Sequence, residues 1–502
     1  MITHRRSSMK SKRILCLLMV VLLTLGLFAG CGKKNGGSGT ETTKQRSQNT
    51  TPTYNKDPQD LGDYELNILH VESDLWNMNT SLAPTDYTGD IISSAVFSRN
   101  EYVQDLYNCY ITEHNDVTFY DMASRISTLV MSGQCPYDAA YSEGSSVNQL
   151  VSQGMLENLY SYSELQLGAK WWSQIVNKDS TLGSGKYQTL YFTQSNLSLT
   201  AFDLTWCIFF NKAVQSEYDL PDYYQIVRDG NWTIETLYQN AKKIAAMRGD
   251  ETFDYSADGN SLYGMTTYWN GAKAMLIGGG GEFVVKNDDD ELTVATFGEE
   301  YVDLCNELAK LFGEPGTFTY GGASSGSTTG NASDYLKIFN ANRALFLGSE
   351  VKSSVSDLKT FTGEFGILPM PSYGEGDGYR SWVNYLAPVL TIPKNTEDPH
   401  KAALLLDVLS YYSDEEVLPI YYDQVLRGRG TSDLDSWEML DIINETRCFE
   451  VSIAYGWSRQ FVEVVSNLVF QGNGSAASNQ PDSYKDVIQE SIESTMKAVF
   501  GE

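Results

Sequence analysis

Aromatic and polar side chains occur together at several points of the chain, each time near the end of a predicted strand. These residues are Asp74, Trp76, Tyr141, Glu143, Tyr268, Trp269, Glu350, Trp382, Asn384 and Tyr385. An aromatic ring offers an apolar face, while carboxylates and amides hydrogen-bond to hydroxyl groups. A cleft that combines both is suited to a saccharide. Each ring could instead be a packing residue, and packing is the favoured interpretation for Trp206. Among these residues, Trp269 and Trp382 are the preferred candidates for the binding site.

The composition is compatible with a binding site of this kind. The chain has 502 residues with 32 Tyr, 20 Phe and 9 Trp, which is more rings than an ordinary core requires. Its formal net charge of -28 excludes a nucleic-acid binder, which needs a basic surface. The charge also disfavours a strongly anionic solute, unless arginines near the cleft override the average: Arg427, Arg429 or Arg459. The length favours two or more lobes.

One motif tests an enzymatic interpretation. Gly322 to Gly326 matches the GxSxG pattern, which in hydrolases forms a tight turn between a strand and a helix. Here no apolar strand precedes the motif, and the only downstream histidine is His400. We interpret the match as chance composition and assign no catalytic residue. A carboxylate pair for glycoside hydrolysis stays open in a chain with 64 acidic residues.

The sequence predicts no metal site and no cofactor. Asp288, Asp289 and Asp290 are adjacent, whereas a calcium loop alternates its ligands, so an exposed hairpin turn is the preferred interpretation. The cysteines of the folded part show no CxxC spacing and are expected to be buried thiols: Cys109, Cys135, Cys207, Cys305 and Cys448.

The N-terminus is predicted to be a targeting segment. Five basic residues precede an apolar run at 14–29 that is short for a membrane span. The run ends in Leu27-Phe28-Ala29-Gly30-Cys31, which resembles the lipobox of bacterial lipoproteins, although Leu is commoner at the position of Phe28. The resemblance implies cleavage after residue 30 and diacylation of Cys31, which holds a protein on a membrane surface. An uncleaved signal anchor is the alternative.

Residues 31–60 are expected to form the lipidated cysteine and a flexible tether. Beyond Cys31 the segment contains no Leu, Ile, Val or Phe and is rich in small and polar residues. The folded part is therefore predicted to begin near Leu61.

Hydrophobic patterns along the folded part predict alternating strands and helices, and hence an α/β fold. The expected strands are 64–71, 137–141, 262–267, 344–347 and 363–371. The expected helices are 100–110, 120–132, 148–153, 301–312, 399–412 and 482–500, with a further one opening after the N-cap Thr233.

Four segments, in this order, resemble the family 1 extracellular solute-binding proteins of ABC importers. They are 209–233 (FFNK, then LP, then NWT), 339–346 (FNANRALF), 365–371 (FGILPMP) and 392–403 (IPKNT, then P and AA). Asn342 stands where the family usually has Gly, and Phe209 where it usually has Tyr. The resemblance covers about residues 61–502.

This resemblance implies a two-lobed fold of the type II periplasmic-binding-protein kind, with the ligand cleft between lobes joined by a hinge of several chain crossings. Lobe 1 would hold 61–192 and 368–412, and lobe 2 would hold 193–367 and 413–502. Among the residues above, the family places ligand contacts near Asp74 and Trp76, at Tyr268 and Trp269, and at Glu350.

The implied function is capture of a carbohydrate, expected to be an oligosaccharide, by lobe closure and its delivery to the transmembrane subunits of an ABC permease. We expect a monomer on the extracytoplasmic face of the cell membrane, held there by its lipid. Polyol, peptide and anionic-sugar binders share the scaffold. A surface glycoside hydrolase and a solute sensor that feeds a signalling partner are the alternatives.

Overall fold

The computed structural model describes residues 54–70, 81–87, 90–144, 146–251, 253, 259–287, 291–320, 334–427 and 434–501. Several predictions fall outside these ranges. They concern the targeting segment and Cys31, the site residues Asp74 and Trp76, the aspartates 288–290, and the GxSxG match at 322–326.

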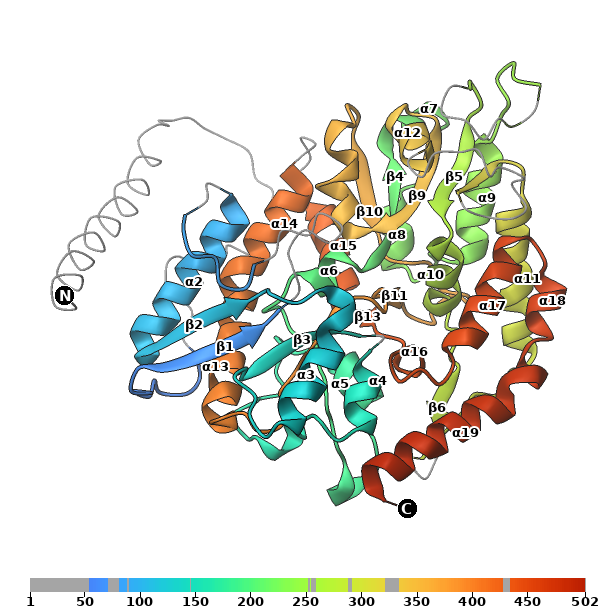
Figure 1. Ribbon diagram of the computed structural model, residues 1–502. Helices are drawn as coiled ribbons and strands as arrows, with labels where there is room; N and C mark the ends of the chain where they lie inside the picture. Colours follow the sequence, from blue (N-terminus) through green and yellow to red (C-terminus); the bar gives the residue numbers. More distant parts are fainter. Residues whose placement is uncertain are drawn as a thin grey trace, which may run out of the picture. The chain divides into compact units, whose positions relative to one another are not determined.

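The first sheet has four strands in the order β12-β3-β1-β2. Strands β1 and β2 are parallel, as are β1 and β3, while β12 runs antiparallel to β3. Figure 1 shows β1, β2 and β3 side by side. The strands are β1 (Tyr64–Leu69), β2 (Cys109–His114), β3 (Ala139–Glu143) and β12 (Pro388–Thr391).

Both faces of this sheet are covered, because side chains of alternate residues point to opposite faces of a strand. Leu66 and Ile68 join one hydrophobic cluster with helix α13 (Pro399–Tyr412). Leu69 joins a different cluster, which contains helices α3 (Met122–Met131) and α4 (Val147–Ser152). The sheet therefore lies between two helical layers, which is the α/β arrangement that the sequence predicts.

The second sheet has five strands in the order β10-β4-β9-β5-β8. Strand β5 is parallel to β8 and β9, whereas β4 is antiparallel to both β9 and β10. Its strands are β4 (Trp206–Asn211), β5 (Tyr263–Tyr268), β8 (Thr317–Tyr320), β9 (Ala344–Glu350) and β10 (Phe365–Leu368).

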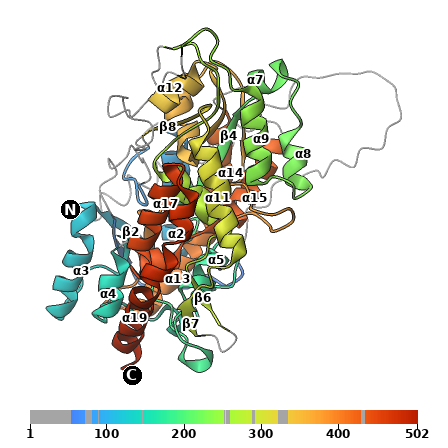
Figure 2. The same cartoon turned by 90° about the vertical axis from the view of Figure 1, so that its right-hand side faces the viewer.

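Helices from both halves of the sequence pack around this sheet. Helices α11, α17 and α18 lie side by side in Figure 1, and the turned view of Figure 2 again shows α11 beside α17. The longer helices here are α9 (Ile234–Ile244), α10 (Asn270–Gly278), α11 (Glu299–Gly313), α12 (Asp334–Asn340), α14 (Leu418–Arg427), α15 (Leu434–Glu445) and α17 (Arg459–Phe470), with the short α18 (Gly474–Ser478). The last helix, α19 (Pro481–Phe500), instead contacts α4.

Two chain segments that connect the sheets run alongside each other. Residues 193–205 lead into β4, and residues 383–387 lead into β12. The two segments form an antiparallel bridge at Thr205↔Val383, and Thr193 of the first segment forms another with Leu390 of β12. Just before the second segment, the short strand β11 (Ser381–Trp382) pairs with β13 (Arg447–Cys448). The junction of the two sheets is thus built from segments that lie far apart in the sequence.

Most predicted elements are present, and one was placed wrongly. The helix expected at 100–110 is α2, which begins at Ile91 and ends at Tyr107. Asn108 ends it in a left-handed conformation (φ 48°), and the chain enters β2 at once. Thr233 caps α9 as predicted, since its side chain accepts a hydrogen bond from the Thr236 backbone. Asn342 is also left-handed (φ 57°), a conformation that glycine and asparagine adopt most readily.

The packed part of the chain begins earlier than the sequence predicts. Tyr54 is buried, and its hydroxyl donates a hydrogen bond to the carboxylate of Asp407 on α13. Lys56 donates to the backbone oxygen of Glu164 at 3.2 Å. The predicted tether boundary at residue 60 is therefore corrected. Tyr54, Asn55 and Lys56 together attach this segment through polar contacts, which a pattern of aliphatic residues does not reveal.

All five cysteines of the described ranges are buried thiols, as predicted. Burial raises the pKa of Cys109 to about 12 and the pKa values of Cys305 and Cys448 to about 11. Within the same ranges, no helix combines the length and the apolar character that a membrane crossing requires.

Candidate functional site

Two neighbouring strands of the second sheet end in a hydrogen-bonded pair. Tyr268 is the last residue of β5 and Glu350 the last residue of β9, and the tyrosine hydroxyl donates to Glu350 Oε1 at 2.5 Å. Burial, reinforced by the Glu350 carboxylate, raises the pKa of Tyr268 well above its ordinary value. The phenol therefore stays protonated and donates to Glu350.

Two tryptophans lie between the Tyr268–Glu350 pair and the junction of the sheets. Trp206 is the residue opposite Glu350 in the ladder between β4 and β9. Its ring centroid lies 5.0 Å from that of Tyr268 and 6.2 Å from that of Trp382, and the two indoles are stacked at 29°. Tyr385 lies 6.2 Å beyond Trp382. We call Trp206, Tyr268, Trp382 and Tyr385 the aromatic cluster.

The connecting segments hold the two indoles together. Trp382 pairs with Cys448 in the β11–β13 ladder, and the Val383 backbone donates to Cys448 O at 2.8 Å. The Asn384 backbone donates to Leu204 O at 3.0 Å, next to the bridge between Thr205 and Val383. Trp206 and Trp382 therefore meet because of backbone pairing between segments that are 176 positions apart, and not because of local sequence.

A buried lysine covers one side of the aromatic cluster. Lys273 Nζ lies 4.8 Å from the ring centroid of Tyr385, 5.9 Å from Trp382 and 5.4 Å from Trp269. These distances are within the range of cation–π attraction. The ammonium also forms a 2.5 Å ion pair with Glu463 on α17. Burial lowers the pKa of Lys273, and Glu463 opposes that shift.

The cluster has an exposed edge. Trp269 is 42% exposed and contacts Tyr268 edge-on with centroids 6.1 Å apart. Arg459 lies on the Tyr385 ring, with its guanidinium carbon 5.1 Å from the centroid. Side chains from α10, α17 and the β11 region thus surround the rings, and the exposed fraction rises from Trp382 outwards to Trp269.

Three buried polar atoms beside these rings have no hydrogen-bond partner in the described part of the chain. They are the indole Nε1 atoms of Trp206 and Trp382 and the side-chain oxygen of Asn270. Both tryptophans are 0% exposed, and Asn270 is 4% exposed. Asn270 follows Trp269 directly and opens α10.

The structure brings five of the predicted site residues together: Tyr268, Trp269, Glu350, Trp382 and Tyr385. Asn384 is adjacent, but its side-chain oxygen accepts from the Leu386 backbone, so it shapes the turn. Glu143 ends β3 and pairs with Pro388 in the first sheet. Tyr141 packs in the cluster between that sheet and α13, with His70 as its ring neighbour at 5.6 Å.

Several of the predicted site residues lie inside strands, at or near the strand ends. Tyr141, Glu143, Tyr268, Glu350 and Trp382 all lie within strands. Tyr268, Glu350 and Trp382 are each the last residue of a strand, so the candidate site is built on hydrogen-bonded backbone.

The sequence patterns did not single out Lys273, Asn270 or Glu463. The packing role expected for Trp206 agrees with its complete burial in the hydrophobic core. One local signal for Lys273 was available: it lies four residues after Trp269, so both share a face of a helix. That signal depends on recognising α10, which no hydrophobic pattern in the sequence predicts. Trp206, Asn270 and Glu463 offer no comparable signal, because their partners lie on distant elements.

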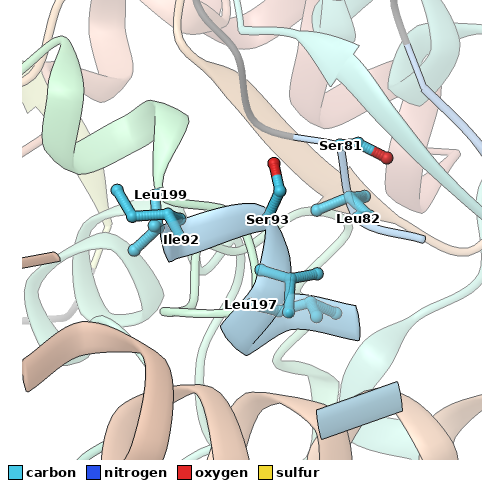
Figure 3. A pocket seen from close by; sticks show the side chains of 7 residues that line it. Ser81, Leu82, Ile92, Ser93, Leu197 and Leu199 are labelled. Carbon is cyan, nitrogen blue, oxygen red and sulfur yellow. The ribbon is translucent and has the colours of Figure 1, made fainter. Parts of the chain in front are cut away.

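The described clefts lie elsewhere. The largest, about 990 Å³, lies between the loop after α10 and the start of α11, and several carboxylates line it: Glu282, Glu299, Glu300, Asp303 and Asp377. No tryptophan lines it. A pocket of about 10 Å³ between α2 and residues 197–199 has room for about one water molecule; Figure 3 shows its leucine and isoleucine side chains with two serines. We place the candidate site at the aromatic cluster because five of the predicted site residues meet there.

Comparison with known proteins identifies the class of protein. Residues 115–410 match the model of the family described as bacterial extracellular solute-binding protein. This match covers more than half of the chain, and the chain belongs to this family. A search of curated proteins finds no match.

Solved structures show the same fold. The GacH receptor of Streptomyces glaucescens, described unliganded and with acarbose, is 12% identical with a TM-score of 0.52, over 85% of this chain and 99% of that one. A cyclo/maltodextrin-binding protein complexed with maltotetraose is 12% identical with a TM-score of 0.54, over 88% of this chain and 99% of that one.

A third structure is an ABC substrate-binding protein from Listeria monocytogenes in complex with cycloalternan. It is 12% identical with a TM-score of 0.51, over 86% of this chain and 99% of that one. The fold of the chain is the two-lobed α/β fold of type II periplasmic binding proteins, as predicted. The lobe boundaries at residues 192, 367 and 412 stay predictions.

Proposed function

We propose that this protein is the solute-binding lipoprotein of an ABC importer and that its solute is a carbohydrate of oligosaccharide size. The observation that carries the proposal is the aromatic cluster at the junction of the two sheets, with Glu350 hydrogen-bonded at one end and Lys273 at the other. Stacked rings beside fixed polar groups are the combination that a sugar requires. Sugars in the related structures support the same solute class.

Solute capture would proceed by closure of the two lobes. The cluster takes residues from the second sheet and from the segments that connect the sheets, so a change of angle between the sheets alters its surroundings. A solute that contacts both sides favours the closed state, because only differential contacts shift such an equilibrium.

Binding is tested by a thermal-shift screen of the purified protein with neutral, acidic and amino mono- and oligosaccharides, followed by calorimetry on the best probe. We expect a rise in Tm, a change in tryptophan fluorescence and recovery of the sugar intact. Reducing sugar that accumulates with time would instead establish the glycoside hydrolase alternative. Absence of binding to every saccharide would refute the proposed solute class.

We also propose that Cys31 carries the lipid that holds the protein at the outer face of the cell membrane. Replacement Cys31→Ser should release the protein from the membrane fraction into the medium, because the acyl chains are attached through that thiol. The measurement is immunoblotting of the two fractions. Continued pelleting with membranes would mean that the apolar segment is retained as an anchor.

Transport and sensing differ in what a deletion removes. If the protein delivers solute to a permease, deletion abolishes uptake of the radiolabelled solute. If it feeds a signalling partner, uptake persists and the transcriptional response to the solute is lost.

A further inference from the structure

We infer that a pocket separate from the aromatic cluster binds the ammonium group of a small aliphatic amine. The pocket has a volume of about 330 Å³, and no residue of the aromatic cluster lines it. Charged side chains of both signs line it: Asp179, Glu282, Glu450, Lys178, Lys286 and Arg380. This second site is independent of the solute that the cluster binds.

Segments that are distant in sequence form the pocket. Helix α5 (Gln174–Ser180) supplies one wall, and the hairpin of β6 (Val284–Lys286) and β7 (Leu292–Val294) supplies a second. The chain between β13 and α16 (Val451–Ala454) supplies a third. Helix α5 contacts both β13 and α16 (Figure 1). An occupant would contact several of these segments at once, so its binding should stabilise the folded protein.

Glu450 is a buried carboxylate without a counter-ion. It is 7% exposed, and one of its oxygens accepts a hydrogen bond from Ser452 Oγ at 2.6 Å. The guanidinium of Arg380 forms its ion pair with Glu282 instead, at 2.5 Å. In the part of the chain that the structure describes, neither Glu450 nor Asp179 has an ion-pair partner. Buried charges are ordinarily paired, so a cation in the pocket would complete the arrangement.

The electrostatics of the pocket favour a cation as its occupant. Burial raises the pKa of Glu450 to about 7, and the carboxylates of Asp179 and Glu282 reinforce that shift. Burial also raises the pKa of Asp179. A cation beside these carboxylates would offset both their desolvation and their mutual repulsion. Lys178 is exposed and Lys286 is half-buried, so neither lysine is enclosed together with Glu450.

The largest described cleft, about 990 Å³, adjoins this pocket, since Glu282, Val285 and Arg380 line both. The cleft adds further carboxylates and no further basic side chain: Glu299, Glu300, Asp303 and Asp377. A cleft lined mainly by charge of one sign raises the local concentration of ligands of the opposite sign. Cations are therefore attracted towards the pocket, and anions are repelled from it.

The remaining walls select an organic cation. Val284, Leu292 and Phe449 give the pocket an apolar lining. Within the ranges that the structure describes, no group of three or more metal-ligating side chains occurs, whereas Ca²⁺ requires six or more oxygen ligands. An alkylammonium ion donates three hydrogen bonds and lays its methylene groups against apolar walls. The volume is near the lower end for ligand pockets, which suits a compact amine.

Binding is measured by calorimetry at pH 8, where Glu450 is ionised, in about 0.15 M NaCl, which screens weak surface attraction. The probes are n-butylamine and 1,4-diaminobutane, which are ammonium ions at this pH as lysine is. The neutral and anionic matches are n-butanol and butyrate. We expect at least one amine to bind and to raise Tm, and neither match to do so. Absence of binding by both amines would overturn the inference and would mean that a lysine is the counter-ion.

Three variants locate the bound amine. Glu450→Gln and Asp179→Asn each remove one carboxylate from the pocket, so affinity for the amine should fall at least about 10-fold through loss of a charge-assisted hydrogen bond. The matched control Glu300→Gln removes the same charge from the adjoining cleft alone and should change the affinity less than about 3-fold. The Tm of each variant without amine checks that it is folded.

Two results with these proteins would contradict the inference. Equal losses of affinity in all three variants would mean that the amine binds a diffuse acidic surface. Preferential binding of MgCl₂ or KCl, with displacement of the amine, would assign the pocket to an inorganic cation.

Discussion

Lys273 is a cation in a place where burial would ordinarily favour a neutral group. It is 1% exposed, and its ammonium is stabilised by three ring faces and by Glu463. A buried ion pair contributes little net stability, but removal of one partner leaves an uncompensated charge. The pair therefore constrains where α17 lies against α10.

The ion pair between Lys273 and Glu463 can be broken by a single substitution. Glu463→Gln should lower the free energy of unfolding by about 2 to 3 kcal/mol, somewhat less than for a fully buried pair because Glu463 is one-third exposed. Chemical denaturation measures the change. In the control Glu235→Gln, which breaks an exposed pair with Lys310, the change should stay below about 1 kcal/mol. Equal effects in the two variants would contradict a special role for Lys273.

Two tryptophans at the site should respond differently to truncation. Trp269 is 42% exposed, so Trp269→Ala should keep the fold and weaken sugar binding about 5- to 50-fold through loss of stacking. Trp382 is completely buried, so Trp382→Ala should cost about 3 to 5 kcal/mol of stability. Calorimetry and denaturation together distinguish the two. A strongly destabilised Trp269→Ala would mean that its ring is part of the core.

At the scale of elements, hydrophobic periodicity predicted the strands and helices whose pattern lies within a single segment of the sequence. The apolar patterns of the sequence predicted strands β1, β3, β5, β9 and β10. Tyr268, Trp269 and Glu350 were predicted as site residues because they lie at the ends of β5 and β9. Helix α10 escaped prediction because all nine of its residues are buried, so it has no polar face to give a helical period. The meeting of Trp206 with Trp382 was not predictable either, because pairing between distant segments creates it.

Asp407 connects helix α13 to distant segments at this scale. Its carboxylate accepts from the indoles of Trp171 and Trp172, from the Gln166 backbone and from the hydroxyl of Tyr54. Asp407→Asn introduces an amide that cannot accept from all of these, so we expect a loss of about 3 kcal/mol in chemical denaturation. Tyr54→Phe removes two hydrogen bonds, the one donated to Asp407 and the one accepted from Gln166 Nε2, and should cost about 1 to 2 kcal/mol. Equal losses would show that the Tyr54 contact dominates.

For the whole molecule, buried carboxylates make stability depend on pH. Burial raises the pKa of Glu450 to about 7, although a hydrogen bond from Ser452 and the charge of Arg380 oppose the shift. Between its ordinary pKa of about 4.5 and about 7, the folded state holds the proton that the unfolded chain has released. Stability from this group is therefore present at low pH and lost as the pH rises through 7.

Glu450→Gln should remove this dependence. At pH 8 the variant should be more stable than the wild type by up to about 3 kcal/mol, and at pH 4 the two should be nearly equal. Denaturant unfolding at a series of pH values measures the difference. A constant offset between the two curves would show that Glu450 does not titrate between pH 4 and 8.

The five buried thiols have a practical consequence for following lobe movement. Because no described cysteine is exposed and burial raises the pKa of Cys109, Cys305 and Cys448, these thiols should react slowly with maleimides at neutral pH. A cysteine introduced on an exposed residue of each lobe would therefore be labelled selectively. With a donor and an acceptor dye at those positions, the protein would become an optical reporter of its own solute.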